Sequence, residues 1–274
     1  MADPRIAFIG GGNMARSLIG GLLASGWRQD QITVADPDSK QLEGVRRDFR
    51  DIKTAAGNRE AAANQNIVLL AVKPQVMRAA ATELNGIAAG TLVMSIAAGV
   101  RSPDIEHWLG GAAPVVRCMP NTPALVRRGA TALFSTPKVS AHQRQLAEEI
   151  MRAVGITVWV EEENLLDPVT ALSGSGPAYF LLLMEVMEQT GKRMGLPEEA
   201  ARRLTLQTAL GAAELASQSD DSAATLRARV TSKGGTTERA IDHLIGAGFI
   251  RDFARAIELA ADRARELADG LSAH

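Results

Sequence analysis

Residues 6–15 read IAFIGGGNMA, and this stretch decides the fold. Four apolar residues form a candidate buried strand, and the glycine pattern G-x-G-x-x-A follows at once, from Gly10 to Ala15. Glycines permit a tight turn and a close approach of the backbone to a ligand. The helix that follows offers unpaired N–H groups and the positive end of its dipole to a pyrophosphate. The stretch therefore predicts the first strand, turn and helix of a dinucleotide-binding domain.

The first 160 residues continue in the same manner and alternate short β-branched runs with longer Ala-rich stretches. Residues 67–72 (IVLLAV) are apolar on both faces, which is typical of a parallel sheet covered by helices on each side. Because the glycine turn opens this pattern, binding is favoured over a turn selected for its conformation alone. We expect an α/β fold with an N-terminal Rossmann-type, doubly wound parallel sheet. The expected strands are Ile6–Ile9, Ile32–Ala35, Ile67–Val72, Leu92–Ile96 and Val115–Arg117, and Ala130–Ser135 and Ile156–Val160, on either side of a helix at Ser140–Val154, are candidate extensions whose pairing is open.

After Val160 the pattern changes. An acidic turn, residues 161–164 (EEEN), is followed to the end of the chain by apolar spacing of helical period and no convincing strand. We therefore expect a dinucleotide-binding domain at 1–163 and an all-helical domain for substrate binding and dimerisation at 164–274. A few helices of this kind bury little apolar surface alone, so they should pack against another subunit. The breaks that divide them into four or five helices are Gly174–Pro177, Gly195–Pro197, Ser217–Ser222, Lys233–Thr237 and Gly246–Gly248.

Composition narrows the function classes. With 46% apolar residues, 22% charged residues and a net charge of −1, the chain is typical of a globular protein, and it lacks the basic charge of a dedicated nucleic-acid binder. The single cysteine, Cys118, and the absence of an export signal at the N-terminus favour the cytoplasm. The longest apolar run, Ala178–Met184, is far shorter than the ~20 residues of a membrane span, so we assign it to a buried helix and expect no membrane partner.

Asp36 closes the second expected strand, where an acidic side chain can accept hydrogen bonds from the 2′-hydroxyl of an adenosine ribose. Taken literally, this favours NAD. A 2′-phosphate would be repelled unless Lys40 or the backbone turn of residues 37–39 offsets the charge, so NADP stays open. A solvated turn aspartate before a proline is an equally good interpretation.

Further cofactor contacts are expected where the strands end, because ligands of open α/β sheets bind beyond the carboxyl edge. Lys73 could meet a hydroxyl or carboxylate there, although a surface lysine is a serious rival. Asn58 could meet the adenosine or cap a helix, and Asn121 lies in a rigid loop between two prolines that could form a wall of the nicotinamide pocket. The predicted cofactor-binding residues are Ile9, Gly10, Gly11, Gly12, Asn13, Met14, Asp36, Asn58, Ala71, Val72, Lys73, Pro74, Ala97, Ala98, Gly99 and Asn121.

Two glycine-rich loops are predicted to open helices in the second half: residues 173–179 (SGSGPAY) and 231–237 (TSKGGTT). A helix start with bare N–H groups binds a carboxylate as readily as a phosphate. Ordinary capping needs one Ser or Thr. The second loop has four hydroxyls and two adjacent glycines, so we favour an anion site.

The sequence lacks the motifs that metal binding, phosphoryl transfer and serine hydrolysis require. The four histidines, His107, His142, His243 and His274, have neither metal-ligand spacing nor a partner acid, so no metal site is predicted. Neither a P-loop nor a nucleophile elbow occurs, which argues against phosphoryl transfer and serine hydrolysis.

Residues 10–15, 71–74, 119–123, 172–179 and 230–241 together resemble the pyrroline-5-carboxylate reductase family. The resemblance implies that NADPH or NADH delivers hydride to C5 of the cyclic imine Δ1-pyrroline-5-carboxylate, which gives L-proline. It further implies a homodimer of intertwined helical domains, in which one subunit's substrate loop completes the other's nucleotide site, and larger rings of dimers such as a decamer. An electrophilic imine carbon needs alignment more than a histidine base.

The same resemblance assigns the substrate residues. The carboxylate would be held by Ser232, Gly234, Gly235, Thr236 and Thr237. Thr237 is also the predicted catalytic residue, since its hydroxyl would hydrogen-bond the ring nitrogen or relay its proton, with water as the alternative proton source. Lys233 departs from the family, whose members often have proline there; it either attracts the carboxylate or points to solvent.

Two other functions stay open. A β-hydroxyacid dehydrogenase or imine reductase could share this plan, but the former would be expected to place a catalytic lysine on a domain-linking helix, and Tyr179–Met194 offers only Lys192 near its end. A non-catalytic dinucleotide-binding module is the non-enzyme alternative, and the intact substrate loop argues against it.

Overall fold

The computed structural model describes residues 3–272, so the prediction for His274 lies outside the described residues. The described chain divides into two compact units. One comprises residues 3–175 together with 259–272, and the other comprises residues 176–258. The sheet-containing unit thus extends past residue 163 and includes the end of the last helix.

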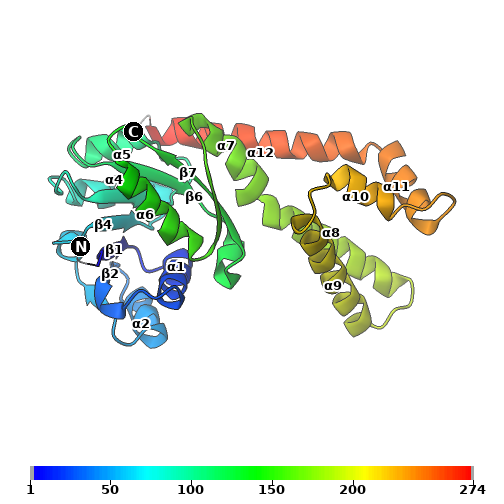
Figure 1. Cartoon of the computed structure of the whole chain (residues 1–274), viewed down its shortest axis with the longest axis horizontal. Coiled ribbons are helices and arrows are strands. Elements are labelled where there is room, and N and C mark those ends of the chain that lie inside the picture. The colour runs from blue at the N-terminus through cyan, green and yellow to red at the C-terminus, as the bar shows by residue number, and fades with distance from the viewer. Residues whose placement is uncertain (1–2, 273–274) are drawn as a thin grey trace. The chain divides into compact units, whose positions relative to one another are not determined.

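The first unit is built on one sheet of eight strands in the order β3-β2-β1-β4-β5-β6-β7-β8 (Figure 1). All neighbours pair in parallel except β6 and β7, so the pairing that the sequence left open is antiparallel between β6 and β7 and parallel between β7 and β8. The strands are β1 (Ile6–Ile9), β2 (Ile32–Ala35), β3 (Lys53–Ala55), β4 (Ile67–Leu70), β5 (Leu92–Ser95), β6 (Val115–Met119), β7 (Gly129–Ser135) and β8 (Gly155–Trp159).

The Rossmann-type α/β fold is confirmed, with two corrections of detail. The edge strand β3 was missed, because its sequence Lys-Thr-Ala is short and polar and carries no apolar signal. The third predicted strand is two residues too long, since β4 ends at Leu70 and residues 71–72 belong to the following turn.

Two apolar cores lie on the two faces of the sheet, because successive side chains of a strand point to opposite sides. Ile6 and Phe8 of β1 join one core with side chains of α1, α2 and α6, and Ala7 and Ile9 join the other with α3, α4 and α5. Ser140 caps α6, as the predicted helix start required. The helices are α1 (Asn13–Ala24), α2 (Ser39–Asp48), α3 (Asn58–Ala62), α4 (Pro74–Glu83), α5 (Ser102–Trp108), α6 (Ala141–Arg152) and α7 (Leu166–Val169), with the 3-10 helices η1 (Gln29–Gln31), η2 (Thr122–Val126) and η3 (Glu163–Leu165).

From Glu163 to Ser272 the described chain contains helices and turns and no strand, as predicted. The predicted break at Gly174–Pro177 is found as a bend at Ser175. A π-helical turn, η4 (Thr170–Gly174), follows α7, the Ser175 N–H donates to the Thr170 carbonyl at 2.8 Å, and the next helix begins at Gly176. The breaks around Gly195, Ser217, Gly234 and Gly246 are found. The second unit contains α8 (Gly176–Arg193), α9 (Glu198–Ser217), α10 (Ala223–Arg229), α11 (Thr236–Gly246) and the beginning of α12 (Phe249–Ser272).

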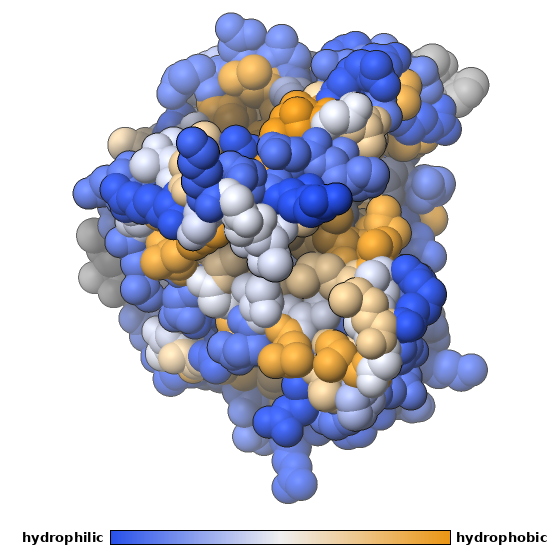
Figure 2. Space-filling model, turned by 90° about the vertical axis from the view of Figure 1, so that its right-hand side faces the viewer, coloured by the Kyte–Doolittle hydropathy of each residue, from blue (hydrophilic) through white to orange (hydrophobic). Residues whose placement is uncertain are grey.

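The second unit is poorly buried in the single chain. Figure 2 shows apolar residues in patches among hydrophilic ones on one face of the molecule. Phe180, Leu181 and Leu182 of α8 are all about 60% exposed, so the prediction that this apolar run belongs to a buried helix is wrong for the isolated chain. Within residues 3–272 one helical run, Glu163–Arg193, is long and apolar enough to cross a membrane. Length and composition alone are weak evidence for a membrane span.

Candidate functional site

The glycine turn after β1 lies at the point where the strand order reverses between β1 and β4. Gly10 has a φ of +104°, and a Cβ there would lie 2.6 Å from the Ala71 carbonyl oxygen, so only glycine fits. Gly12 begins α1 without a side-chain cap, has open space where a Cβ would be, and is followed by no acidic residue in the first turn. An uncapped helix start with room above it fits a pyrophosphate.

Asp36 lies beside this turn and holds it in place. One carboxylate oxygen accepts the Gly11 N–H at 2.7 Å, and the other accepts the Asp38 N–H at 2.9 Å. The residue is therefore more than a solvated turn aspartate, since it fastens the end of β2 to the glycine turn. Each oxygen keeps a second lone pair that a ribose hydroxyl could use.

The loops after β4 and β5 complete this edge of the sheet. Lys73 is exposed and precedes Pro74, the first residue of α4. After β5, Ala97 is buried, and Gly99 has a φ of +77° and lies against α12, where a Cβ would be 3.5 Å from the Cα of Ala268. The backbone after β5 therefore runs close to the C-terminal helix.

Both predicted asparagines use their side chains within the protein. Asn58 is the first residue of α3 and donates to Glu83 at 2.8 Å, while Gly57 takes the cap position. Asn121 accepts the Ala130 N–H at 2.9 Å and donates to the Ser173 carbonyl at 3.0 Å.

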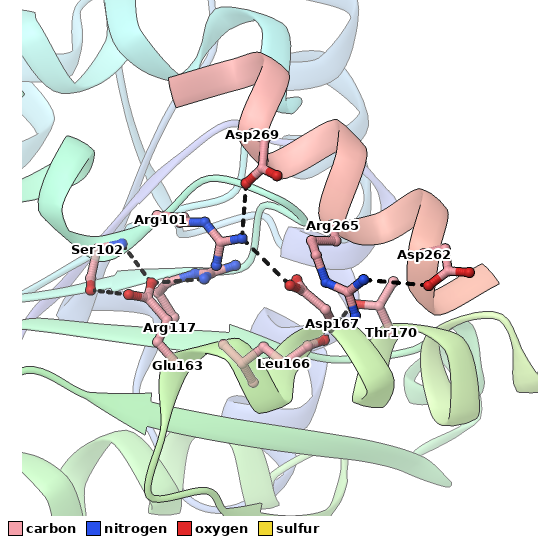
Figure 3. Close-up of polar contacts among 10 residues, drawn as sticks. All are labelled: Arg101, Ser102, Arg117, Glu163, Leu166, Asp167, Thr170, Asp262, Arg265 and Asp269. Carbon is pink, nitrogen blue, oxygen red and sulfur yellow. Dashed lines mark hydrogen bonds and ion pairs between the residues drawn. The ribbon is translucent and has the colours of Figure 1, made fainter. Parts of the chain in front are cut away.

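A charged cluster lies beside the loop after β5 (Figure 3). Glu163 accepts hydrogen bonds from the backbone and hydroxyl of Ser102, at 2.6 and 2.8 Å, and from the buried guanidinium of Arg117 at 2.7 Å. Arg101 reaches Asp167 at 3.5 Å and Asp269 at 3.3 Å. The cluster ties α7 and α12 to the sheet.

Residues 231–237 form the second candidate site. Gly234 has a φ of +73°, and its N–H donates to the Glu238 carboxylate at 2.6 Å, while the Gly235 N–H donates to the Ser232 carbonyl at 3.0 Å. Helix α11 then begins at Thr236 with no side-chain cap. The other predicted loop, residues 173–179, spans the end of the π turn and the start of α8 at Gly176, so a helix does start there as predicted.

Comparison with known proteins places these sites in a family. The model described as "Pyrroline-5-carboxylate reductase dimerisation" matches residues 163–267, and the model "NADP oxidoreductase coenzyme F420-dependent" matches residues 5–99. The chain is 49% identical over 272 residues to the pyrroline-5-carboxylate reductase of Pseudomonas aeruginosa, with 99% of each chain covered. The chain belongs to the pyrroline-5-carboxylate reductase family.

Solved structures agree with this assignment. A pyrroline-5-carboxylate reductase from Coxiella burnetii has a TM-score of 0.91 at 43% identity and covers 97% of this chain and 99% of its own. The Plasmodium falciparum pyrroline carboxylate reductase, determined with NADP bound, has a TM-score of 0.87 at 26% identity, with 98% and 99% covered. The predicted family and its NADP-dependent oxidoreductase class are thus confirmed.

The sequence did not reveal the charged cluster of this pyrroline-5-carboxylate reductase family member. Arg117 was predicted only as the last residue of a strand, and Glu163 only as part of an acidic turn. The one available signal was a charged residue within an apolar strand, which requires a buried partner. The sequence cannot say which of many carboxylates that partner is.

Two further groups bear on the chemistry. Within residues 3–272 no group of three or more His, Cys, Asp or Glu side chains is arranged to hold a metal ion. Burial raises the pKa of the Cys118 thiol far above its ordinary value, although the nearby Arg117 charge opposes the shift. The thiol is therefore kept protonated and unreactive.

Proposed function

We propose that this protein is a pyrroline-5-carboxylate reductase, which uses NADPH or NADH to reduce Δ1-pyrroline-5-carboxylate to L-proline. A hydride adds to C5 and a proton to the ring nitrogen, so the C=N bond becomes CH–NH. The observation that carries the proposal is the 49% identity to a named reductase along the whole chain. The geometry of the two candidate sites supports it.

The substrate carboxylate would bind at the start of α11. Since the N–H groups of Gly234 and Gly235 already donate within the loop, the donors left for a ligand are the N–H groups of Thr236 and Thr237 and the hydroxyls around them. The helix dipole favours an anion at this place. The glycines thus shape the loop, and the threonines and Ser232 bind.

The imine nitrogen would be served by Thr237. Its hydroxyl would donate a hydrogen bond to the nitrogen. Water would supply the proton that the nitrogen gains, because an unperturbed threonine is a poor acid. When bound, the reduced nicotinamide supplies the hydride. The chain's own contribution to that step is alignment of the two reactants.

The cofactor would lie across the carboxyl edge of the sheet. Its pyrophosphate would take the uncapped start of α1 at Gly12, and its adenosine ribose would lie near Asp36. The predicted contacts after β4 and β5, at residues 71–74 and 97–99, would border the nicotinamide ribose. The carboxylate of Asp36 favours NADH, and Lys40 would offset it for NADPH.

The active form would be a homodimer, or a larger ring of dimers, in the cytoplasm. The exposed apolar residues of the second unit supply the surface for it. A hollow of 580 Å³ between α8, α9 and α11, lined by Met187, Leu204 and Leu244 among others, is apolar and open enough to receive side chains of a second copy. The partner's residues 231–237 would complete the nucleotide site.

The absorbance of NADPH and NADH, followed separately with pyrroline-5-carboxylate and then with 3-hydroxy acids, tests the proposal. We expect NADPH or NADH to be oxidised with pyrroline-5-carboxylate and not with the hydroxy acids. Turnover only with a hydroxy acid would indicate a β-hydroxyacid dehydrogenase, and cofactor binding without turnover would indicate a binding module.

Lys192 already ion-pairs with Glu198 at 3.1 Å, which argues against its use as a catalytic lysine. Thr237→Ala should slow turnover but leave residual activity, and sedimentation should show no active monomer.

A further inference from the structure

We propose that Asn121 is a positioning residue for the nicotinamide end of the cofactor, and that it acts by replacing a hydrogen-bond donor that a proline removes from the neighbouring helical run. The inference rests on the proposed function, because the loop after β6 can be a wall of the nicotinamide pocket only if the protein binds the cofactor as proposed. The Asn121 side chain holds that wall against the π turn η4.

Pro177 creates the need for this contact. In an α-helix the carbonyl of Ser173 would accept the N–H of the residue four positions on, which is Pro177 and has no N–H. The π turn at Thr170–Gly174 precedes the proline, and α8 begins at Gly176 after the single residue Ser175, whose φ of −82° and ψ of −22° are close to those of a helix. A partly buried carbonyl that loses its donor is costly unless another group supplies one.

Asn121 supplies it. Its Nδ2 donates to the Ser173 oxygen at 3.0 Å, and its Oδ1 accepts the Ala130 N–H at 2.9 Å at the beginning of β7. Because one end of the amide meets an acceptor and the other a donor, the orientation of the side chain is fixed by its partners. One residue therefore joins the loop after β6, the strand β7 and the π turn.

The residues around Asn121 confine the effect of its hydrogen bonds to the loop after β6 and the π turn. Asn121 is the N-cap residue of the 3-10 helix η2 and lies between Pro120 and Pro123, so the backbone has little freedom to adjust. Gly174 of the π turn lies so close to the loop that a Cβ would be 2.6 Å from Met119 Cε. Loss of the Asn121 contacts should thus loosen the pocket wall and leave the glycine turn at Gly10 untouched.

Two ligands separate this role from general damage to the domain. NADPH carries the nicotinamide, whereas 2′-phospho-ADP-ribose carries the same adenosine and pyrophosphate without it. For Asn121→Ala, titration should show an NADPH dissociation constant raised about tenfold, the effect of one unpaired buried polar group, and an unchanged constant for 2′-phospho-ADP-ribose. Equal losses for both ligands, or none for either, would overturn the proposal.

Further variants test the link to the proline. Pro177→Ala returns an N–H to the helix, so the double variant Asn121→Ala/Pro177→Ala should bind NADPH more tightly than Asn121→Ala. Equal NADPH affinities of the two would refute the part played by the Ser173 carbonyl.

Asn66→Ala is the matched control, since the Asn66 side chain accepts the Arg5 N–H at 2.9 Å before β4. It should lower stability without changing either constant. A wild-type protein that binds NADPH without reducing the imine would refute the proposed function alone, because these titrations need no turnover.

Discussion

The carboxylate of Glu163 lies 2.7 Å from the guanidinium of Arg117, although the two residues are 46 positions apart in the chain. Arg117 is 4% exposed and stands on a central strand, so its charge has little water to stabilise it. Glu163 also accepts two hydrogen bonds from Ser102 at the start of α5. A single carboxylate therefore neutralises a buried charge and anchors a helix.

Glu163→Ala should lower the free energy of unfolding by about 3 kcal/mol, because it leaves the Arg117 charge buried and unpaired. Denaturant unfolding at neutral pH measures the loss. The control is Glu266→Ala, which removes an exposed pair with Arg263 and should cost less than about 1 kcal/mol. Equal effects of the two substitutions would show that burial of the Arg117 pair is unimportant.

The two glycines of the first turn should respond differently to alanine. Gly12→Ala should leave stability nearly unchanged and weaken NADPH binding, since its Cβ would enter open space where the pyrophosphate is expected. Gly10→Ala should destabilise the fold itself, because its Cβ would overlap the Ala71 carbonyl. Thermal unfolding with and without NADPH distinguishes the two. An unaltered NADPH affinity in Gly12→Ala would argue against a phosphate at that helix start.

Glu238 shapes the substrate loop by accepting the Gly234 N–H. Glu238→Ala should raise KM for pyrroline-5-carboxylate several-fold with little change in KM for NADPH, because the loop loses the bond that sets its left-handed turn. Glu238→Gln keeps an acceptor and should restore KM. Asp242→Ala, one helical turn further along α11, is the control. A KM unaffected by loss of the Glu238 carboxylate would mean that the loop keeps its shape unaided.

Cys118 should be silent toward thiol reagents in the native protein and react only on unfolding, since burial raises its pKa. The unfolded thiol loses its proton near pH 9.0, whereas the native one keeps it. The unfolded state therefore binds fewer protons above that pH, and stability falls as pH rises. The free energy of unfolding of the wild type, minus that of Cys118→Ala, should therefore fall as the pH rises. Denaturant unfolding from pH 7 to pH 10 measures both, and parallel curves of stability against pH would contradict the prediction.

The sequence predicted the elements whose signal is local. Strands such as β1 and β4 are apolar on both faces, and Ser140 marks the start of α6. It left open what depends on distant partners, such as the pairing of β7. The antiparallel β7 follows β6 through a short 3-10 connection, with no crossover helix that would permit a parallel return.

The candidate sites divide in the same way. The glycine turn and residues 231–237 were predictable, because glycine and threonine patterns specify backbone shape. Residues 173–179 were predicted to open a helix, and α8 begins there at Gly176, but no local pattern predicted the π turn that precedes this start. The partners of Asn121 and Arg117 lie dozens of residues away, and no pattern within one sequence connects them.

The close packing of Gly99 on Ala268 also sets an order of events during synthesis. The loop after β5 is made before the segment of α12 that covers it. Ala264 and Ala268 are buried in the same unit as the sheet, so this unit cannot be completed until α12 has been made. A stop codon within α12 would thus damage a domain whose strands all precede it in the chain.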